Sequence, residues 1–82
     1  GRRYFLPVIR RINSVVERFG TVEWQVETDR GAYRFTTRDL RDNVLRMGGG
    51  RYILQDVDEN RYEVADAAGL DRASVVRLLR HL

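Results

Sequence analysis

The stretch that decides the fold is W-Q-V-E-T-D-R-G, which runs from Trp24 to Gly31. Its first half belongs to an alternation in which apolar residues occupy every second position and Glu or Gln occupies the positions between. This period of two predicts a strand with one buried face. The D-R-G that follows supplies turn chemistry, because Gly31 adopts a positive φ without steric cost. The stretch therefore predicts a β-hairpin whose returning strand carries Tyr33 and Phe35.

Upstream of this hairpin, residues 7–19 have the sequence P-V-I-R-R-I-N-S-V-V-E-R-F. Their apolar positions fit the spacing of a helix as well as that of a strand. The density of β-branched residues favours a strand. We therefore predict a strand over residues 9–17.

Downstream, residues 36–47 have the sequence T-T-R-D-L-R-D-N-V-L-R-M. Thr36 and Asp39 have the spacing of a capping box, and Leu40, Val44 and Met47 fall on one helical face. The triplet G-G-G that follows is typical of a helix C-cap. This segment therefore predicts a helix.

The last third of the chain predicts a second hairpin and a second helix. Residues 51–57 and 61–65 form the two strands, with D-E-N as their turn, and Asp71 caps a helix with an apolar stripe at Val75, Leu78, Leu79 and Leu82. The predicted order is β-β-β-α-β-β-α. The fold class is then α+β, with a mainly antiparallel sheet of about five strands and two helices on one face.

Composition limits residues 1–82 to a single small α+β domain. A chain of 82 residues has room for one core but not for a deep active-site cleft. It contains no cysteine, which excludes disulfides and thiolate chemistry. No apolar run approaches the ~18 residues that a membrane span needs. We therefore expect a cytoplasmic protein that does not insert into the membrane.

The sharpest chemical signal is the D-x-D-x-N spacing of Asp56, Asp58 and Asn60, which opens a calcium loop. An EF-hand needs Gly at the sixth position and Glu at the twelfth, where this chain has Arg61 and Ala67. The same residue types form hairpin turns through local hydrogen bonds. We predict a turn here and no metal site.

Catalytic residues are equally hard to find in this sequence. The only imidazole is His81, which we expect to face solvent or to act as a favourable cation at the end of the last helix. The carboxylates of Glu23, Glu27 and Asp29 share the solvent face of a strand, where we expect cross-strand pairing with Arg34. We therefore predict that the chain is not an enzyme and binds no cofactor.

Aromatic residues and arginines raise the alternative of a nucleic-acid-binding module. Five rings alternate with polar residues along the predicted strands, and stacking on bases would use them. They are Trp24, Tyr33, Phe35, Tyr52 and Tyr62. Burial in the core explains the alternation better, and the 15 basic residues are interleaved with 12 acidic ones rather than clustered.

Three stretches resemble a bacterial family of unknown function that is associated with cyanophycin metabolism and with ABC-transporter proteins. They are L-P-V-I-R-R-I (residues 6–12), W-Q-V-E-T-D-R-G (residues 24–31) and L-D-R-A-S-V-V-R-L-L-R-H-L (residues 70–82). Between them, I-L-Q-D-V-D-E-N-R-Y-E-V-A-D is similar to the second hairpin of the family. The resemblance implies an accessory role beside a transporter or a polymer of aspartate and arginine. It transfers no catalytic residue.

Members of that family usually carry a further β-rich segment before the L-P-V-I stretch, so this chain is either a fragment or a short form. A missing segment exposes a sheet edge, which leads us to expect a homodimer. We expect a protein partner such as an ABC-transporter component, recognised by a surface that Glu27, Asp29, Arg30 and Gly31 form or brace. The alternative is that these four residues only specify the turn, with Arg30 and Glu27 as a surface pair.

Overall fold

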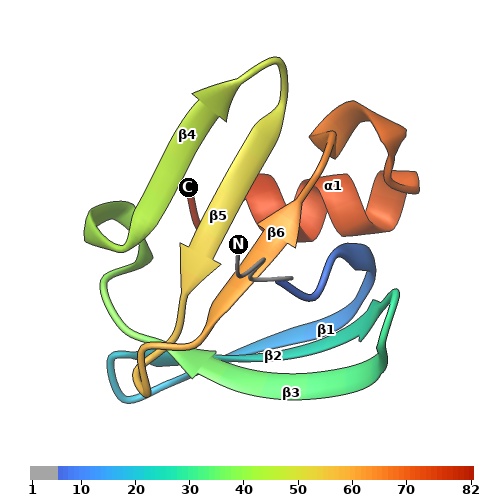
Figure 1. Cartoon of the computed structure of the whole chain (residues 1–82). Helices are drawn as coiled ribbons and strands as arrows, with labels where there is room; N and C mark the ends of the chain where they lie inside the picture. Colours follow the sequence, from blue (N-terminus) through green and yellow to red (C-terminus); the bar gives the residue numbers. More distant parts are fainter. Residues whose placement is uncertain (1–5) are drawn as a thin grey trace, which may run out of the picture.

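The computed structural model describes residues 6–82, and within them the chain forms six strands, one α-helix and two short 3-10 helices. The strands are β1 (Ile9–Arg18), β2 (Thr21–Thr28), β3 (Gly31–Thr37), β4 (Val44–Gly48), β5 (Arg51–Gln55) and β6 (Arg61–Val64). The helices are η1 (Leu40–Asp42), η2 (Ala67–Gly69) and α1 (Arg72–Leu79). Figure 1 shows their arrangement in space.

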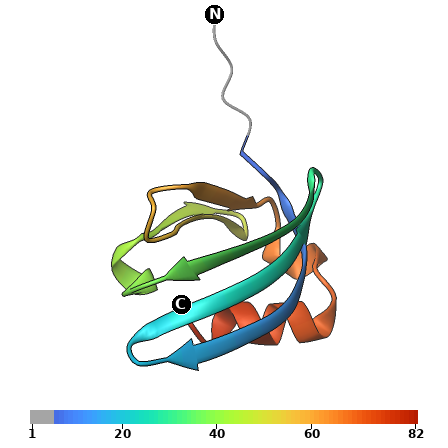
Figure 2. The ribbon, with the colours of Figure 1, turned by 90° about the horizontal axis from the view of Figure 1, so that it is seen from below.

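The strands form two antiparallel three-stranded sheets, in the orders β1-β2-β3 and β4-β5-β6. One sheet stands over the other in Figure 1, and in Figure 2 helix α1 lies along the side of the first sheet that ends in β1. The predicted strand at residues 9–17 and the predicted hairpin are both confirmed, since Trp24 lies opposite Phe35 and Thr28 opposite Gly31.

The core lies between the two sheets and is closed by α1. Every strand except β4 contributes a fully or nearly fully buried apolar residue, as does the helix. The largest buried side chains include Trp24 and Val26 from β2, Ile12 from β1, Leu54 from β5 and Leu78 from α1. The period of two that predicted β2 is therefore the pattern of its burial, because alternate residues of a strand face the same side.

The predicted fold class, α+β with one mainly antiparallel sheet and two helices, is wrong. The structure is mainly β, with six strands in two sheets instead of one sheet of about five strands, and it has one α-helix instead of two helices. The missing helix is the one that we expected over residues 36–47. This segment ends β3, forms the single turn η1, and then enters strand β4.

Local hydrogen bonds hold η1 as a single turn. Asp39 adopts a left-handed conformation with φ of 50° and makes no capping hydrogen bond, so the predicted capping box is absent. The side-chain amide of Asn43 donates to the carbonyls of Arg38 and Asp39. These bonds close the turn after three residues, and Val44 and Leu45 then pair with Leu54 and Ile53 of β5.

The glycine triplet is the turn of the β4–β5 hairpin rather than a helix C-cap. Gly48 lies opposite Arg51, so Gly49 and Gly50 form a two-residue loop. Their φ angles are 63° and 81°, and a tight hairpin of this kind requires positive φ at both loop positions. The predicted helix C-cap at this triplet is therefore wrong.

Helix α1 begins where we predicted it, and it is anchored to β1 by buried polar groups. Asp71 caps the helix by accepting from the backbone N–H of Ser74. The Ser74 hydroxyl accepts from the backbone N–H of Ile12 at 2.8 Å, and Arg77 donates to the Ile12 carbonyl at 2.9 Å. These bonds satisfy backbone groups of β1 beside a register shift in that strand. Leu79, which we placed in the buried stripe, is exposed.

Candidate protein-interaction groove

The four residues of the predicted recognition surface lie at the tip of the β2–β3 hairpin. The turn is organised by Thr28, whose hydroxyl accepts from the Arg30 backbone N–H and donates to the Gly31 carbonyl. Gly31 has a φ of 108°, as the turn prediction requires. Glu27 lies beside Arg11 of β1, with 3.9 Å between Oε2 and Nε. Gly31, one of these four residues, therefore specifies the turn of the hairpin.

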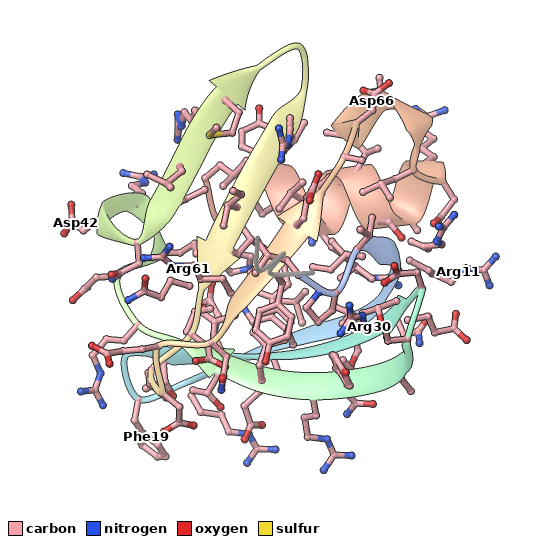
Figure 3. All side chains as sticks on the ribbon, viewed as in Figure 1. Arg11, Phe19, Arg30, Asp42, Arg61 and Asp66 are labelled. Atoms are coloured by element: carbon pink, nitrogen blue, oxygen red, sulfur yellow. The ribbon has the colours of Figure 1, made fainter. Side chains whose placement is uncertain are left out.

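Asp29 makes hydrogen bonds to a segment that is distant in the sequence, beyond its own turn. Its backbone N–H donates to the carbonyl of Val8 at 3.0 Å, and its Oδ1 accepts from the Val8 backbone N–H at 2.8 Å. The same segment continues to β6, because the backbone N–H of Glu63 donates to the Pro7 carbonyl. Asp29 therefore holds Val8, and Glu63 holds the neighbouring Pro7, so this segment lies between the two sheets. Figure 3 shows Arg30, the residue after Asp29, at this end of the hairpin.

Pro7 forms one wall of a groove of about 560 Å³ between the sheets, which we call the edge groove. Its lining residues are Leu6, Pro7, Tyr33, Arg34, Glu59, Asn60, Arg61 and Tyr62. Tyr33 and Arg34 are consecutive in β3, as are Arg61 and Tyr62 in β6. Consecutive strand residues point to opposite faces of a sheet, so a groove lined by both must run along the strand edges.

Both strands that border the groove are edge strands of their sheets. The carbonyl of Thr36 accepts from the Val57 N–H, which shows that the backbone groups of Thr36 point away from β2. Because this direction alternates along a strand, those of Arg34 also point outward. By the same argument the bond from Glu63 to Pro7 means that the backbone of Arg61 points away from β5.

The floor of the groove is aromatic. Tyr62 stacks on Phe35 with 4.0 Å between ring centroids, and Tyr33 meets Tyr62 edge-on at 6.1 Å. Burial, together with a hydrogen bond from its hydroxyl to Asp56, raises the pKa of Tyr62 well above its usual value. Tyr62 is therefore held in place, whereas Tyr33 remains 37% exposed and is available to a ligand.

Asp56 organises the turn at the end of the groove. Its Oδ1 accepts from the backbone N–H groups of Asp58 and Asn60, and its Oδ2 accepts from the hydroxyl of Tyr62 at 3.0 Å and from the Asn60 side chain. The D-x-D-x-N spacing is thus accounted for by local hydrogen bonding, as the turn prediction proposed. Within residues 6–82 no cluster of three or more metal-ligating side chains occurs.

The aromatic platform that base stacking would need is not assembled on the surface. Trp24 is fully buried, its Nε1 donates to the Thr37 hydroxyl at 2.8 Å, and its ring stacks on Phe35. Phe35 and Tyr62 are buried as well. The core interpretation of these three rings is therefore confirmed, and Tyr33 is the ring exposed in the groove.

Two ionisable groups lie elsewhere than expected. His81, which we expected to face solvent or to act as a cation at the end of the last helix, does not face solvent: it packs edge-on against Trp24 at 5.5 Å, and its Nδ1 lies 3.7 Å from Oε1 of Glu17. Glu23, for which we expected a pairing with Arg34, lies 3.0 Å from Arg18. Arg34 makes no hydrogen bond or ion pair with any other residue in the described range 6–82.

The edge groove is the feature that sequence reasoning missed. Its two halves, Tyr33-Arg34 and Arg61-Tyr62, lie far apart in the sequence, and each looks like an ordinary strand segment. Only the packing of the two sheets brings them together. The signal that the sequence does carry is the repeated pairing of tyrosine with arginine at the ends of the two predicted hairpins.

Comparison with known proteins relates the chain to a family. A family model described as "Domain of unknown function (DUF1854)" matches residues 1–82. No curated protein and no solved structure matches the chain. Among residues 6–82, none of the helices has the length and apolar character that crossing a membrane requires.

Proposed function

We propose that this chain, which belongs to the DUF1854 family of domains of unknown function, is a non-catalytic accessory domain that binds a protein partner through its edge groove. The observation that carries the proposal is the meeting of two strand edges at one groove that exposes Tyr33 beside Arg34. Open strand edges recognise extended segments of other chains, and tyrosine and arginine are enriched among the residues that contribute most to binding at protein interfaces.

The tip of the β2–β3 hairpin supports this function by holding one wall of the groove in place. Asp29 holds Val8, and the neighbouring Pro7 lines the groove. Asp29 is one of the four residues of the predicted recognition surface, and its role in this proposal is to position a wall of the groove. A direct contact of Glu27, Arg30 or Gly31 with the partner stays a prediction.

The setting that we propose for this domain is the bacterial cytoplasm, beside an ABC transporter or cyanophycin-related machinery. Support for it comes from the resemblance of three sequence stretches described above. In this setting the partner is an ABC-transporter component.

Site-specific photo-crosslinking in the cells that make the protein tests the proposed function. A photoreactive residue at Tyr33 is expected to crosslink a partner protein, and the crosslink is expected to weaken at least about tenfold when Arg34→Glu is added. The matched control places the photoreactive residue at Arg72, which is exposed at the start of α1. Equal crosslinking from both positions, or none from either, would contradict a groove-mediated function.

The nucleic-acid alternative is tested with the same chain. Fluorescence anisotropy with single-stranded RNA at low salt separates the two functions, because phosphate contacts weaken steeply as salt is added. Tight, salt-dependent RNA binding would favour the alternative over the proposed function.

We also propose that a second copy of the chain is a partner, through strand β4. This strand is at the edge of its sheet, and Leu45 and Met47 are each about half exposed. Light scattering at high concentration is expected to give a dimeric mass, and Leu45→Arg is expected to shift it to a monomer because a buried unpaired charge disfavours association. Arg72→Glu serves as the control. A monomeric mass for the unmodified chain would refute the dimer.

A further inference from the structure

We propose that the edge groove receives an extended peptide in which acidic residues alternate with apolar ones, bound as an added strand. This inference rests on the proposed function and names the chemistry of the partner. It follows from the backbone direction of the two edge strands, from the side on which each lining residue lies, and from the charges along the groove.

Backbone groups of both edge strands face outward at the groove. The outward-facing backbone groups of β3 include those of Ala32 and Arg34, which share the direction of Thr36. Within residues 6–82, Val57 occupies the Thr36 carbonyl, and no backbone group outside the first sheet bonds to Ala32 or Arg34. On β6 the Pro7 carbonyl occupies the Glu63 N–H, which leaves Arg61 as the outward-facing residue at the groove. An extended chain in the groove would find donors and acceptors on both sides.

The tyrosines and the arginines that line the groove lie on opposite sides of their sheets. Tyr33 lies opposite Val26, and Tyr62 lies opposite Leu54, so both tyrosines belong to the inner, core-facing sides of their sheets. Arg34 and Arg61 follow or precede them and therefore belong to the outer sides. A strand between the two edges would direct every second side chain onto the tyrosine floor and the others outward between the arginines.

The charges supply the third step. Arg34 has no ionic partner among the described residues, and Arg61 makes a 3.3 Å hydrogen bond only to the neutral amide of Gln55. Arginine forms bidentate pairs with carboxylates, so the outward positions favour Glu or Asp. Glu59 also lines the groove, within the turn at residues 56–60, and its carboxylate disfavours an acidic residue at that end. The inward positions favour apolar side chains, since the floor is formed by aromatic rings.

A binding titration tests this pattern. A fluorescent peptide of alternating valine and glutamate, about eight residues long, is matched in length to a strand. It is expected to bind the chain, and Arg34→Glu or Arg61→Glu is expected to weaken binding at least about tenfold. Arg72→Glu changes the net charge equally at a distant site and is expected to leave the affinity unchanged. A peptide of the same composition in scrambled order, and one with N-methyl groups on alternate residues, are expected to bind at least about tenfold more weakly.

A charge exchange distinguishes a lost ionic contact from a misfolded variant. The double variant Arg34→Glu and Arg61→Glu is expected to bind a peptide of alternating valine and lysine better than the unmodified chain does, which requires an intact groove. Equal binding of the scrambled or methylated peptides would overturn the inference. If the glutamate peptide fails to bind while the Tyr33 crosslink to a partner depends on Arg34, the acidic-strand inference is wrong and the proposed function stands. If both fail, the proposed function itself is wrong.

Discussion

Replacing Trp24 by alanine is expected to lower the free energy of unfolding by about 3–5 kcal/mol, which is the usual cost of removing a large aromatic side chain from a core. Trp24 is fully buried in the sheet β1-β2-β3 and contacts the rings of Phe35 and His81. A domain of 82 residues has a total stability of only about 4–12 kcal/mol. Urea denaturation followed by circular dichroism measures the loss, and a large part of the Trp24→Ala protein is expected to be unfolded when the total is at the low end.

The hydrogen bond from Trp24 to Thr37 contributes to this cost and can be separated from it. Trp24→Phe keeps much of the ring but leaves the buried Thr37 hydroxyl without its donor, and Thr37→Val removes the other partner. A double-mutant cycle is expected to give a coupling energy of about 1 kcal/mol.

Phe19 provides the matched aromatic control for Trp24. It lies at the β1–β2 turn, is fully exposed, and has a left-handed φ of 46°. Figure 3 shows it directed away from the sheets. Phe19→Ala is expected to change stability by no more than about 0.5 kcal/mol. An equal loss for Trp24→Ala and Phe19→Ala would contradict the core position of Trp24.

The part of the fold that the sequence predicts well is the part whose local pattern and long-range pairing agree. In β2 the period of two coincides with burial of Trp24 and Val26, and Gly31 supplies the turn that the register requires. The cap of α1 is predictable for a similar reason, because Asp71 and Ser74 interact three residues apart. Such short-range chemistry needs no knowledge of the rest of the chain.

Residues 36–47 could not be predicted in this way because their helical spacing is accidental. Leu40 is buried and Val44 half-buried, which is compatible with a helix, but Met47 is exposed. What decides the conformation is the pairing of Val44 and Leu45 with residues of β5. Helix propensity differs among ordinary residues by less than about 1 kcal/mol, so such pairing overrides it.

The candidate site also has one part that local sequence chemistry predicts and another that depends on the whole fold. Asp29 is recognisable as a turn residue, but its bonds to Val8 cross 21 positions and emerge only from the fold. The edge groove depends on how the second sheet lies over the first, which no local pattern specifies. Arg34 and Arg61 therefore look like ordinary surface charges until the sheets place them on either side of one groove.

Asp56→Ala is expected to lower the free energy of unfolding by about 2–4 kcal/mol, because charged acceptors make the stronger hydrogen bonds and their donors would be left without partners. The carboxylate is buried and joins the turn to Tyr62 on the floor of the edge groove. Asp58→Ala is the matched control in the same turn, since no hydrogen bond of the described residues uses its side chain, and is expected to cost no more than about 0.5 kcal/mol. Denaturant unfolding measures both, and equal losses would contradict the central role of Asp56.

The same contact makes stability fall at high pH through Tyr62. Burial and the bond to Asp56 raise the pKa of Tyr62 in the folded state above its ordinary value of 10.0, which the unfolded state retains. Above pH 10 the unfolded chain therefore binds fewer protons than the folded one, so stability is full below that pH and decreases as pH rises. Tyr62→Phe is expected to remove this part of the alkaline loss, which unfolding curves of the two proteins between neutral and alkaline pH would reveal. Asp56→Asn is expected to reduce it, because the negative charge that opposes a phenolate would be gone. Identical alkaline profiles for the unmodified chain and Tyr62→Phe would show that burial and the bond to Asp56 do not raise the pKa of Tyr62, and the floor of the groove would then be less rigid than the structure indicates.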